Sequence, residues 1–478
     1  MGGNLFVLLS SHWAVAPDRE FLVPSSGPSV TYRQIDDRSA SLATVLRERS
    51  VSPGDRVVAQ VDKSIDAVAL YLACLRVGAI YVPLNTSYTA TEVDYFIEDA
   101  APTLTVTNAN FDEVLADADS AEPWHQVETR LADDIAVMIY TSGTTGRSKG
   151  AMLTHANLAS NALTLHAIWR FTPGDVLLHV LPIYHVHGLF VALHTAILNA
   201  STVLFCERFD VEASQALMGE ATVMMGVPTH YIRLLADPNF TEQTVSNIRL
   251  FTSGSAPMTE AVHAEFTERT GHTILERYGM SECGMITSNP YEGDRVAGTV
   301  GFPLPGVALR VKGDDSICAP GEVGVVQTRG PHVFAGYWRQ PEKTEAALDT
   351  SDDPDNPWFI TGDVGSVDDQ GRLTLEGRKG DMIISGGLNV YPREIELLLD
   401  ECAGVQESAV VGIEDADFGE RVVAFVVAEP DASVDPDGLR SELKENLASF
   451  KVPKTITVID ELPRNSMGKV QKTVLRSN

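Results

Sequence analysis

The segment IAVMIYTSGTTGRSKG, residues 135–150, joins an apolar run to a loop rich in glycine and hydroxyl groups. Residues 135–140 are apolar and rich in β-branched side chains, which predicts a buried strand. From Tyr140 to Gly150 the chain carries three glycines, five Ser or Thr hydroxyls and one lysine. Backbone N–H groups, hydroxyls and an ammonium that turn toward one point suit phosphate oxygens. The candidate phosphate-binding residues are Thr141, Ser142, Gly143, Thr144, Thr145, Gly146 and Lys149.

The same loop excludes one large class of phosphate-binding enzymes. The spacing G-x-x-x-x-G-K-[ST] cannot be fitted to residues 140–150, so a P-loop hydrolase is not expected.

The chain on either side of this loop alternates short strands with longer amphipathic helices. Strands are expected at 56–61, 79–82 and 104–106, with helices at 65–77 and 92–99. This alternation predicts an α/β architecture with parallel strands.

A second unit is expected after a shift in composition near residues 377–381. Strands at 408–412, 422–427 and 455–458 and an acidic helix at 439–447 are enough for a small α+β domain. The expected domains are a large N-terminal α/β domain of several subdomains over residues 1–377 and a small, mobile C-terminal domain over residues 378–478.

The amino-acid composition limits the kinds of molecule that this protein is expected to bind. The 478 residues include 65 acidic and 36 basic side chains, which gives a formal charge of −29. This excess argues against a nucleic-acid or anionic-membrane surface, because both need clustered cations. The five cysteines are far apart and form no C-x-x-C motif, and no apolar run reaches about 18 residues. We therefore expect a cytoplasmic protein with reduced thiols.

Four further motifs follow the loop in a fixed order. They are YGMSE at 278–282, ITGD at 360–363, GR at 377–378 and PRNSMGK at 463–469. Together with the loop they resemble the adenylate-forming superfamily of acyl-CoA synthetases, luciferases and peptide-synthetase adenylation domains. The resemblance spans nearly the whole chain and implies an acid–thiol ligase that uses ATP, Mg²⁺ and coenzyme A and forms an acyl-adenylate.

Each motif also suits its implied role chemically. Glu282 is a hard carboxylate of the kind that binds Mg²⁺, and the resemblance adds Thr141 as a second ligand. Asp363 accepts hydrogen bonds only and suits ribose hydroxyls. The resemblance further implies that Tyr278 stacks on adenine, that Ser281 contacts the α-phosphate and that Arg378 lies near the ribose. It also places Ser255 and Glu276 at the nucleotide.

Lys469 is the predicted catalytic cation of the first step. Negative charge builds on the phosphoryl oxygens when a carboxylate attacks the α-phosphorus, and a fixed ammonium stabilises that transition state. Lys472 is expected to be an exposed tail lysine by contrast. The resemblance makes Lys469 a target for a lysine acetyltransferase.

The resemblance also implies that the small domain rotates between the two steps. Gly380 stands where many relatives have Asp or Lys as the pivot. Gly386 and Gly387 match the glycine-rich segment that lines the thiol tunnel.

Two residues bear on which acid is activated. Arg277 directly precedes Tyr278, and a cation there suits a second carboxylate held by a bidentate fork. His187 lies in LPIYHVHGLF, residues 181–190, where His185 and His187 would point to the same side if the segment is extended. No third ligand is evident, so a zinc site is not expected. These segments and the C-terminal tail resemble malonyl-CoA synthetases, which implies malonate as the acid, with methylmalonate as a further substrate.

Three alternative functions remain open from the sequence alone. Arg277 could be structural in a short-chain or aromatic monocarboxylate acyl-CoA synthetase. The chain could load a carrier protein as a stand-alone adenylation enzyme. It could also be an ATP-binding sensor whose catalysis has decayed, although Lys149, Glu282, Asp363 and Lys469 are all present.

Overall fold

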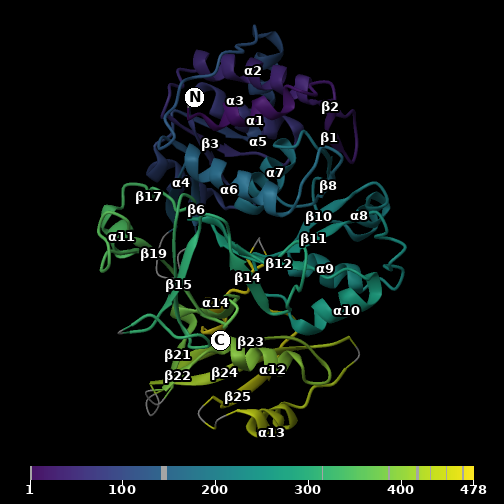
Figure 1. Cartoon of the computed structure of the whole chain (residues 1–478), viewed down its shortest axis with the longest axis vertical. Helices are drawn as coiled ribbons and strands as arrows, with labels where there is room; N and C mark the ends of the chain where they lie inside the picture. Colours follow the sequence, from purple (N-terminus) through teal and green to yellow (C-terminus); the bar gives the residue numbers. More distant parts are fainter. Residues whose placement is uncertain are drawn as a thin grey trace.

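The computed structural model describes residues 3–141, 148–314, 316–385, 388–415, 419–430, 432–447, 449, 451–465 and 468–477. Figure 1 shows the N-terminal layers at the top, the middle of the chain below them, and the C-terminal unit at the bottom. The described strands form three separate sheets.

The first sheet has six strands and carries the phosphate-loop segment. In sheet order they are β17 (Gly336–Tyr337), β7 (Lys149–Thr154), β6 (Ile135–Thr141), β4 (Ile80–Pro83), β3 (Arg56–Gln60) and β5 (Leu104–Thr107). Strands β3, β4, β5 and β6 are parallel, as expected. The chain does not pass directly from the loop into a helix, because β7 first returns antiparallel to β6.

The second sheet has fourteen strands and changes from parallel to antiparallel pairing across its width. In sheet order they are β15 (Ala308–Lys312), β16 (Gly324–Arg329), β19 (Trp358–Val367), β20 (Leu373–Arg378), β14 (Thr299–Pro303), β13 (Gly284–Ser288), β12 (Leu275–Met280), β11 (Leu250–Ser253), β10 (Val223–Gly226), β8 (Val176–His179), β9 (Thr202–Phe205), β1 (Glu20–Pro24) and β2 (Val30–Thr31), with β18 (Leu348–Asp349) on β19. From β12 to β1 the strands are parallel, so their carboxyl ends share one edge. The other strands are antiparallel, a region that the alternating pattern did not predict.

Helices fill the space between these two sheets and cover their outer faces. The inner helices are α1 (Leu5–Trp13), α2 (Tyr32–Glu48), α3 (Ile65–Val77), α5 (Asn108–Ser120), α6 (His155–Ile168), the π-helix His187–Leu193 and α7 (His194–Ile197). The outer helices are α8 (Val211–Met218), α9 (Pro228–Leu235) and α10 (Glu260–Thr270) on the large sheet and α4 (Ala90–Ala100) on the small one, with α11 (Pro341–Ala346) beside β17. Alternation along single strands explains the layering: Val57 faces the inner helices and Val58 faces α4.

The third sheet forms the small C-terminal unit. Its strands are β22 (Leu388–Val390), β21 (Ile383–Ser385), β24 (Gly419–Ala428) and β23 (Val405–Asp415), with β25 (Thr455–Val458) on β24; its helices are α12 (Pro392–Asp400), α13 (Pro436–Asn446) and α14 (Lys472–Leu475). This unit has its own apolar core on either side of the sheet. The expected strands and the acidic helix are present. The boundary expected between residues 377 and 378 falls inside β20 and stays a prediction.

In the described part of the chain, no helix is long and apolar enough to span a lipid bilayer.

Candidate active site

One cluster forms where β6, β12 and β17 meet. The Thr141 hydroxyl donates to Oε1 of Glu282 at 3.4 Å, and the Tyr337 hydroxyl donates to the same oxygen at 3.1 Å. Lys149 places its ammonium 4.5 Å from the centre of the Tyr337 ring. The two predicted Mg²⁺ ligands therefore lie side by side, although 141 positions separate them in the chain.

The electrostatics of this cluster favour a bound cation and a polyanion together. Burial raises the pKa of Glu282, while the Tyr337 hydroxyl and the charges of Arg378 and Lys149 act in the opposite direction. Burial and the nearby Lys343 lower the pKa of Lys149. The nearby oxygen donors are all hard, which suits Mg²⁺ rather than a softer metal.

A second cluster connects β12, β19 and β20. The Tyr278 hydroxyl donates to Oδ2 of Asp363 at 2.5 Å, and Nε of Arg378 lies 3.0 Å from Oδ1 of the same carboxylate. Asp363 and Arg378 are cross-strand partners in β19 and β20. Three residues predicted at the nucleoside are thus joined through one carboxylate, which retains free lone pairs for further donors.

Lys469 belongs to a tight turn that lies against the large domain. The N–H of Gly468 donates to the Asn465 carbonyl and the N–H of Lys469 to Oδ1 of Asn465, both at 2.9 Å. Gly468 has φ of 77°, which explains a glycine at this position. A Cβ built on Gly468 would lie 3.8 Å from Oγ1 of Thr229 in α9.

The charge environment of Lys469 matches its predicted role. Its side chain reaches solvent, yet the surrounding protein and the Arg378 guanidinium lower its pKa, while Asp363 and Asp381 oppose that shift. Lys472 is not the exposed tail lysine that the sequence suggested. Its ammonium forms an ion pair of 2.6 Å with buried Glu396, because α14 packs against the small sheet.

Arg277 is buried at the edge of the parallel strands, and the described part of the chain places no anionic partner beside it. Its side chain is only 2% exposed, and its Nε and Nη2 atoms have no hydrogen-bond partner among the described residues. Within the described ranges, no carboxylate lies within ion-pair distance of this guanidinium. Burial lowers the pKa of Arg277 to about 10, so it stays charged at neutral pH.

The neighbouring strand leaves room for this guanidinium. A Cβ at Gly254, just beyond β11, would overlap Nη1 of Arg277 and would lie 2.6 Å from its Cζ. The Ser253 hydroxyl is also buried without a partner. A buried cation and unpaired polar groups thus meet at the carboxyl edge of β11 and β12, the usual place for a ligand in an open α/β sheet.

His187 faces the same region but not from an extended segment. It begins the π-helix His187–Leu193, so the alternative of an extended strand is wrong. Its Nδ1 lies 3.4 Å from Oγ of Ser255, and its Nε2 is buried without a partner. Burial lowers the pKa of both His185 and His187, with Arg277 adding to the shift, so both rings are neutral at pH 7.

Not every predicted residue joins these clusters. Glu276 instead accepts from the Gly298 N–H at 3.2 Å, and burial raises its pKa to about 7. Ser281 lies just beyond β12, next to Glu282. The remaining predicted contacts fall outside the described residues: Ser142, Gly143, Thr144, Thr145, Gly146, Gly386 and Gly387.

The sequence analysis missed Tyr337. This residue is 55 positions from Glu282 and belongs to a two-residue strand, so no local pattern identifies it. Only the pairing of β17 with β7 brings it to the phosphate-loop segment.

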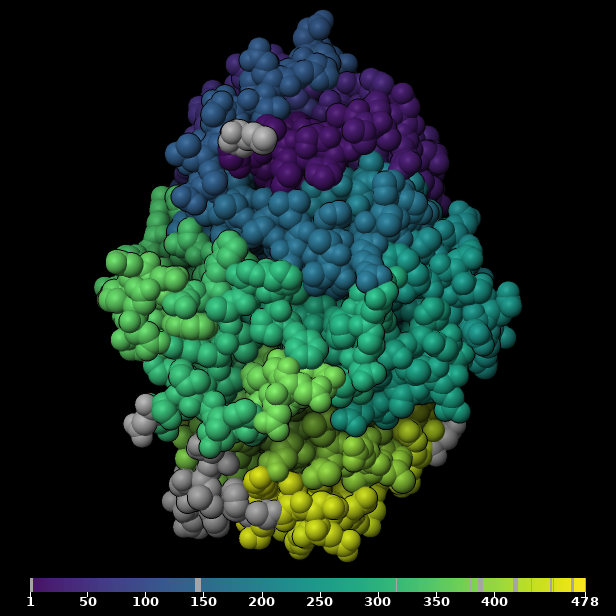
Figure 2. All heavy atoms as spheres, in the orientation of Figure 1, coloured from purple at the N-terminus to yellow at the C-terminus, as the bar shows by residue number. Residues whose placement is uncertain are grey.

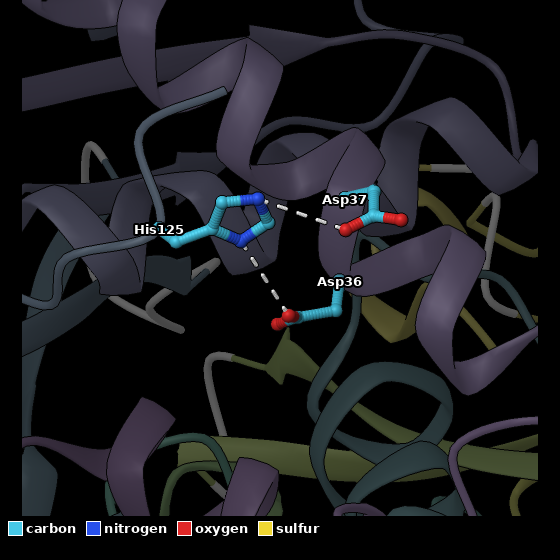
Figure 3. Close-up of side chains that lie close together, drawn as sticks. All are labelled: Asp36, Asp37 and His125. Carbon is cyan, nitrogen blue, oxygen red and sulfur yellow. Dashed lines mark ion pairs between the residues drawn. The ribbon is translucent and has the colours of Figure 1, made fainter.

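A separate His–Asp group lies beside α2, which carries its two aspartates. Figure 3 shows His125 between Asp36 and Asp37, with N···O distances of 3.9 and 3.7 Å. Asp36 already pairs with Arg76 at 2.6 Å. The group is partly exposed and contains none of the predicted nucleotide-binding residues, so we assign it a role in surface electrostatics.

Two protein-family models and a curated relative match this chain. The family model described as AMP-binding enzyme matches residues 9–338, and the model for the AMP-binding enzyme C-terminal domain matches residues 394–469. The mitochondrial malonate–CoA ligase of Mus musculus is 35% identical over 520 residues, which cover 96% of this chain and 88% of that protein.

Solved structures extend the comparison to the arrangement of the domains. ATP-bound MatB from Rhodopseudomonas palustris is 46% identical, covers 100% of this chain and 99% of its own, and superposes with a TM-score of 0.95. Apo MatB from the same organism has the same coverage, 45% identity and a TM-score of 0.85. The small domain lies against the large one in Figure 2, and the ATP-bound neighbour gives the higher of these two TM-scores.

Proposed function

Because this chain belongs to the family of AMP-binding enzymes, we propose that it is an ATP-dependent malonate–CoA ligase that acts through a malonyl-adenylate. The observation that carries the choice of acid is Arg277, a buried cation with unpaired N–H groups and no described carboxylate beside it. Methylmalonate, which has the same two carboxylates, is proposed as a further substrate.

Energetics favour a ligand with a second carboxylate. A buried, unpaired charge is costly, and a carboxylate that accepts two N–H bonds from the guanidinium relieves that cost. A neutral His187 adds a donor without adding charge. A monocarboxylate uses its only carboxylate at phosphorus and would leave Arg277 unpaired.

Adenylation is the first proposed step. A malonate carboxylate oxygen attacks the α-phosphorus of ATP, a new O–P bond forms, and pyrophosphate leaves with the electrons of the broken P–O bond. Lys469 stabilises the charge on the phosphoryl oxygens, and Lys149 binds the phosphates. Tyr278, Asp363, Arg378 and Ser281 hold the rest of the nucleotide.

Glu282 and Thr141 would hold a Mg²⁺ ion at the phosphates. The ion neutralises phosphate charge when it is bound. Their adjacent oxygens, with the Tyr337 hydroxyl beside them, fit that ion.

Thioester formation is the second proposed step. The sulfur of coenzyme A attacks the malonyl carbonyl, a C–S bond forms, and AMP leaves as the acyl C–O bond breaks. We propose that Gly380 is the pivot that turns the small domain, residues 378–478, and that Gly386 and Gly387 line the thiol path. We further propose that a lysine acetyltransferase modifies Lys469, which is an exposed residue. The cytoplasmic location stays a prediction.

A panel of acids tests the proposal. The protein is assayed with malonate, methylmalonate, succinate, acetate and butyrate for CoA thioester, AMP and pyrophosphate. We expect malonate to have the highest kcat/KM, with AMP rather than ADP as product. A preference for acetate or butyrate would support the monocarboxylate alternative, and release of AMP without a CoA thioester would support the carrier-protein alternative.

Glu282→Gln is expected to raise the Mg²⁺ concentration needed for half-maximal rate by at least about tenfold, because a neutral amide replaces the charged ligand. The measurement is a Mg²⁺ titration of pyrophosphate release. Glu268→Gln, at an exposed position in α10, is the matched control. An unchanged Mg²⁺ requirement in Glu282→Gln would show that the metal is held elsewhere.

Gly254→Ala is expected to lower kcat/KM for malonate by roughly tenfold or more, because the added methyl group overlaps the Arg277 guanidinium. KM for ATP should change little. Gly219→Ala is the control, since a Cβ there meets nothing within 4 Å. An equal loss of kcat/KM for malonate in Gly254→Ala and Gly219→Ala would contradict the steric explanation.

A further inference from the structure

Half-buried Lys63 and buried His179 form a pair outside the residues assigned so far. The Lys63 ammonium lies 2.7 Å from Nδ1 of His179 and 2.9 Å from the His179 carbonyl oxygen. It also lies 4.5 Å from the centre of the Phe205 ring. His179 ends β8 and Phe205 ends β9, so the pair is at the same edge of the large sheet as Arg277.

The hydrogen bonds determine which ring nitrogen of His179 carries the proton. Burial lowers the pKa of Lys63 to about 7, so the carbonyl of Gly188, which can only accept, is the partner that fixes the tautomer, and Nδ1 of a neutral ring then accepts from Lys63. Nε2 then carries the proton and donates to the carbonyl of Gly188 at 2.9 Å. Burial lowers the pKa of His179, and the Lys63 charge adds to that effect, so the ring remains neutral.

The Gly188 carbonyl connects this pair to the acid pocket. Gly188 follows His187 in the first turn of the π-helix, and a Cβ on Gly188 would overlap the carbonyl oxygen of Pro182. The backbone at Gly188 is therefore held by the His179 ring on one side and by the close contact with Pro182 on the other. A shift of Gly188 would move His187, whose Nε2 has no hydrogen-bond partner among the described residues and whose pKa the nearby Arg277 helps to lower.

The order of the strands in the sheet supports a role for this pair near a bound ligand. β8 lies between β9 and β10, both of which follow it in the chain, and this is a topological switch point of the parallel region. Crevices at such points bind ligands. Lys63 also lines a cavity of about 490 Å³ together with Phe205 and Glu207.

We propose that Lys63 and His179 are positioning residues of the acid pocket: Lys63 holds the His179 ring through Nδ1, and His179 holds the Gly188 carbonyl so that His187 meets the acid. This inference rests on the proposed function, because it assigns the pocket beside Arg277 to the acid. Neither residue touches the reacting atoms.

The test compares Lys63→Met, Lys63→Arg and the control Lys444→Met in full-length protein. Lys444 is exposed in α13. The acid is whichever one the wild type converts fastest in the panel, so that a wrong choice of acid is detected separately. We expect Lys63→Met to raise KM for that acid about three- to tenfold, the loss of one well-placed hydrogen bond, with KM for ATP within about twofold.

Recovery by the conservative variant separates positioning from general stability. Lys63→Arg keeps a charged donor and should return KM for the acid most of the way to the wild-type value. If Lys63→Met does not fold, Lys63→Gln keeps a neutral donor and should give a smaller rise in the same constant. An unchanged KM for the acid, or equal rises in KM for the acid and for ATP, would overturn the proposal.

Discussion

Arg277→Ala is expected to lower kcat/KM for malonate by roughly thirtyfold to several thousandfold. Removing one partner of a desolvated charge pair costs on the order of 2–5 kcal/mol, and each 1.4 kcal/mol is about a factor of ten. Acetate and butyrate should lose far less, because they have no second carboxylate. The measurement is steady-state kinetics of CoA-thioester formation with each acid.

Arg277→Lys is the matched variant for this result. It keeps the positive charge but loses the planar fork, so it should recover only part of the malonate activity. If all acids lose activity equally in Arg277→Ala, the guanidinium is structural, and the monocarboxylate alternative becomes the better account.

Lys469→Ala is expected to slow malonate-dependent pyrophosphate release by roughly a hundredfold to a thousandfold. A fixed donor at developing charge contributes mainly in the transition state, and its loss therefore appears in kcat. Chemically prepared malonyl-AMP should still react with CoA at close to the wild-type rate, because the proposed rotation of the small domain takes Lys469 away from the phosphate before the thioester step. Acetylation of Lys469 should slow the same half-reaction by removing its charge.

Lys444→Ala provides the control for Lys469, since it removes an exposed ammonium of the same domain. Equal slowing of both half-reactions in Lys469→Ala would contradict a role confined to adenylation.

The fold was predictable where local signals agree with burial. The helix expected at residues 65–77 is α3, because Ser64 caps its first turn and Gly78 ends it in the left-handed conformation. β7 and the antiparallel strands beyond β12 were missed, because short half-buried strands have no period that distinguishes them from loops. Their pairing depends on contacts between distant segments.

The candidate active site was predictable where its functional residues lie in sequence motifs. Thr141, Glu282, Tyr278, Asp363 and Arg378 lie in motifs, and the structure brings them into two adjoining clusters.

Other contributions to the site depend on tertiary contacts alone. Tyr337 reaches Glu282 only through strand pairing, and Lys63 reaches His179 across 116 positions. Single residues of this kind carry no sequence signal. The hydrogen bond that Glu276 accepts from the Gly298 N–H is a tertiary contact of the same kind.

Exchange of labelled pyrophosphate into ATP, measured with malonate and without CoA, tests the central claim most directly. This exchange requires a reversible malonyl-adenylate, and it reports the acid and the intermediate together. We predict rapid exchange with malonate, little with acetate or butyrate, and almost none in Lys469→Ala. Absence of malonate-dependent exchange in the wild-type protein, or equal exchange with acetate, would contradict the account.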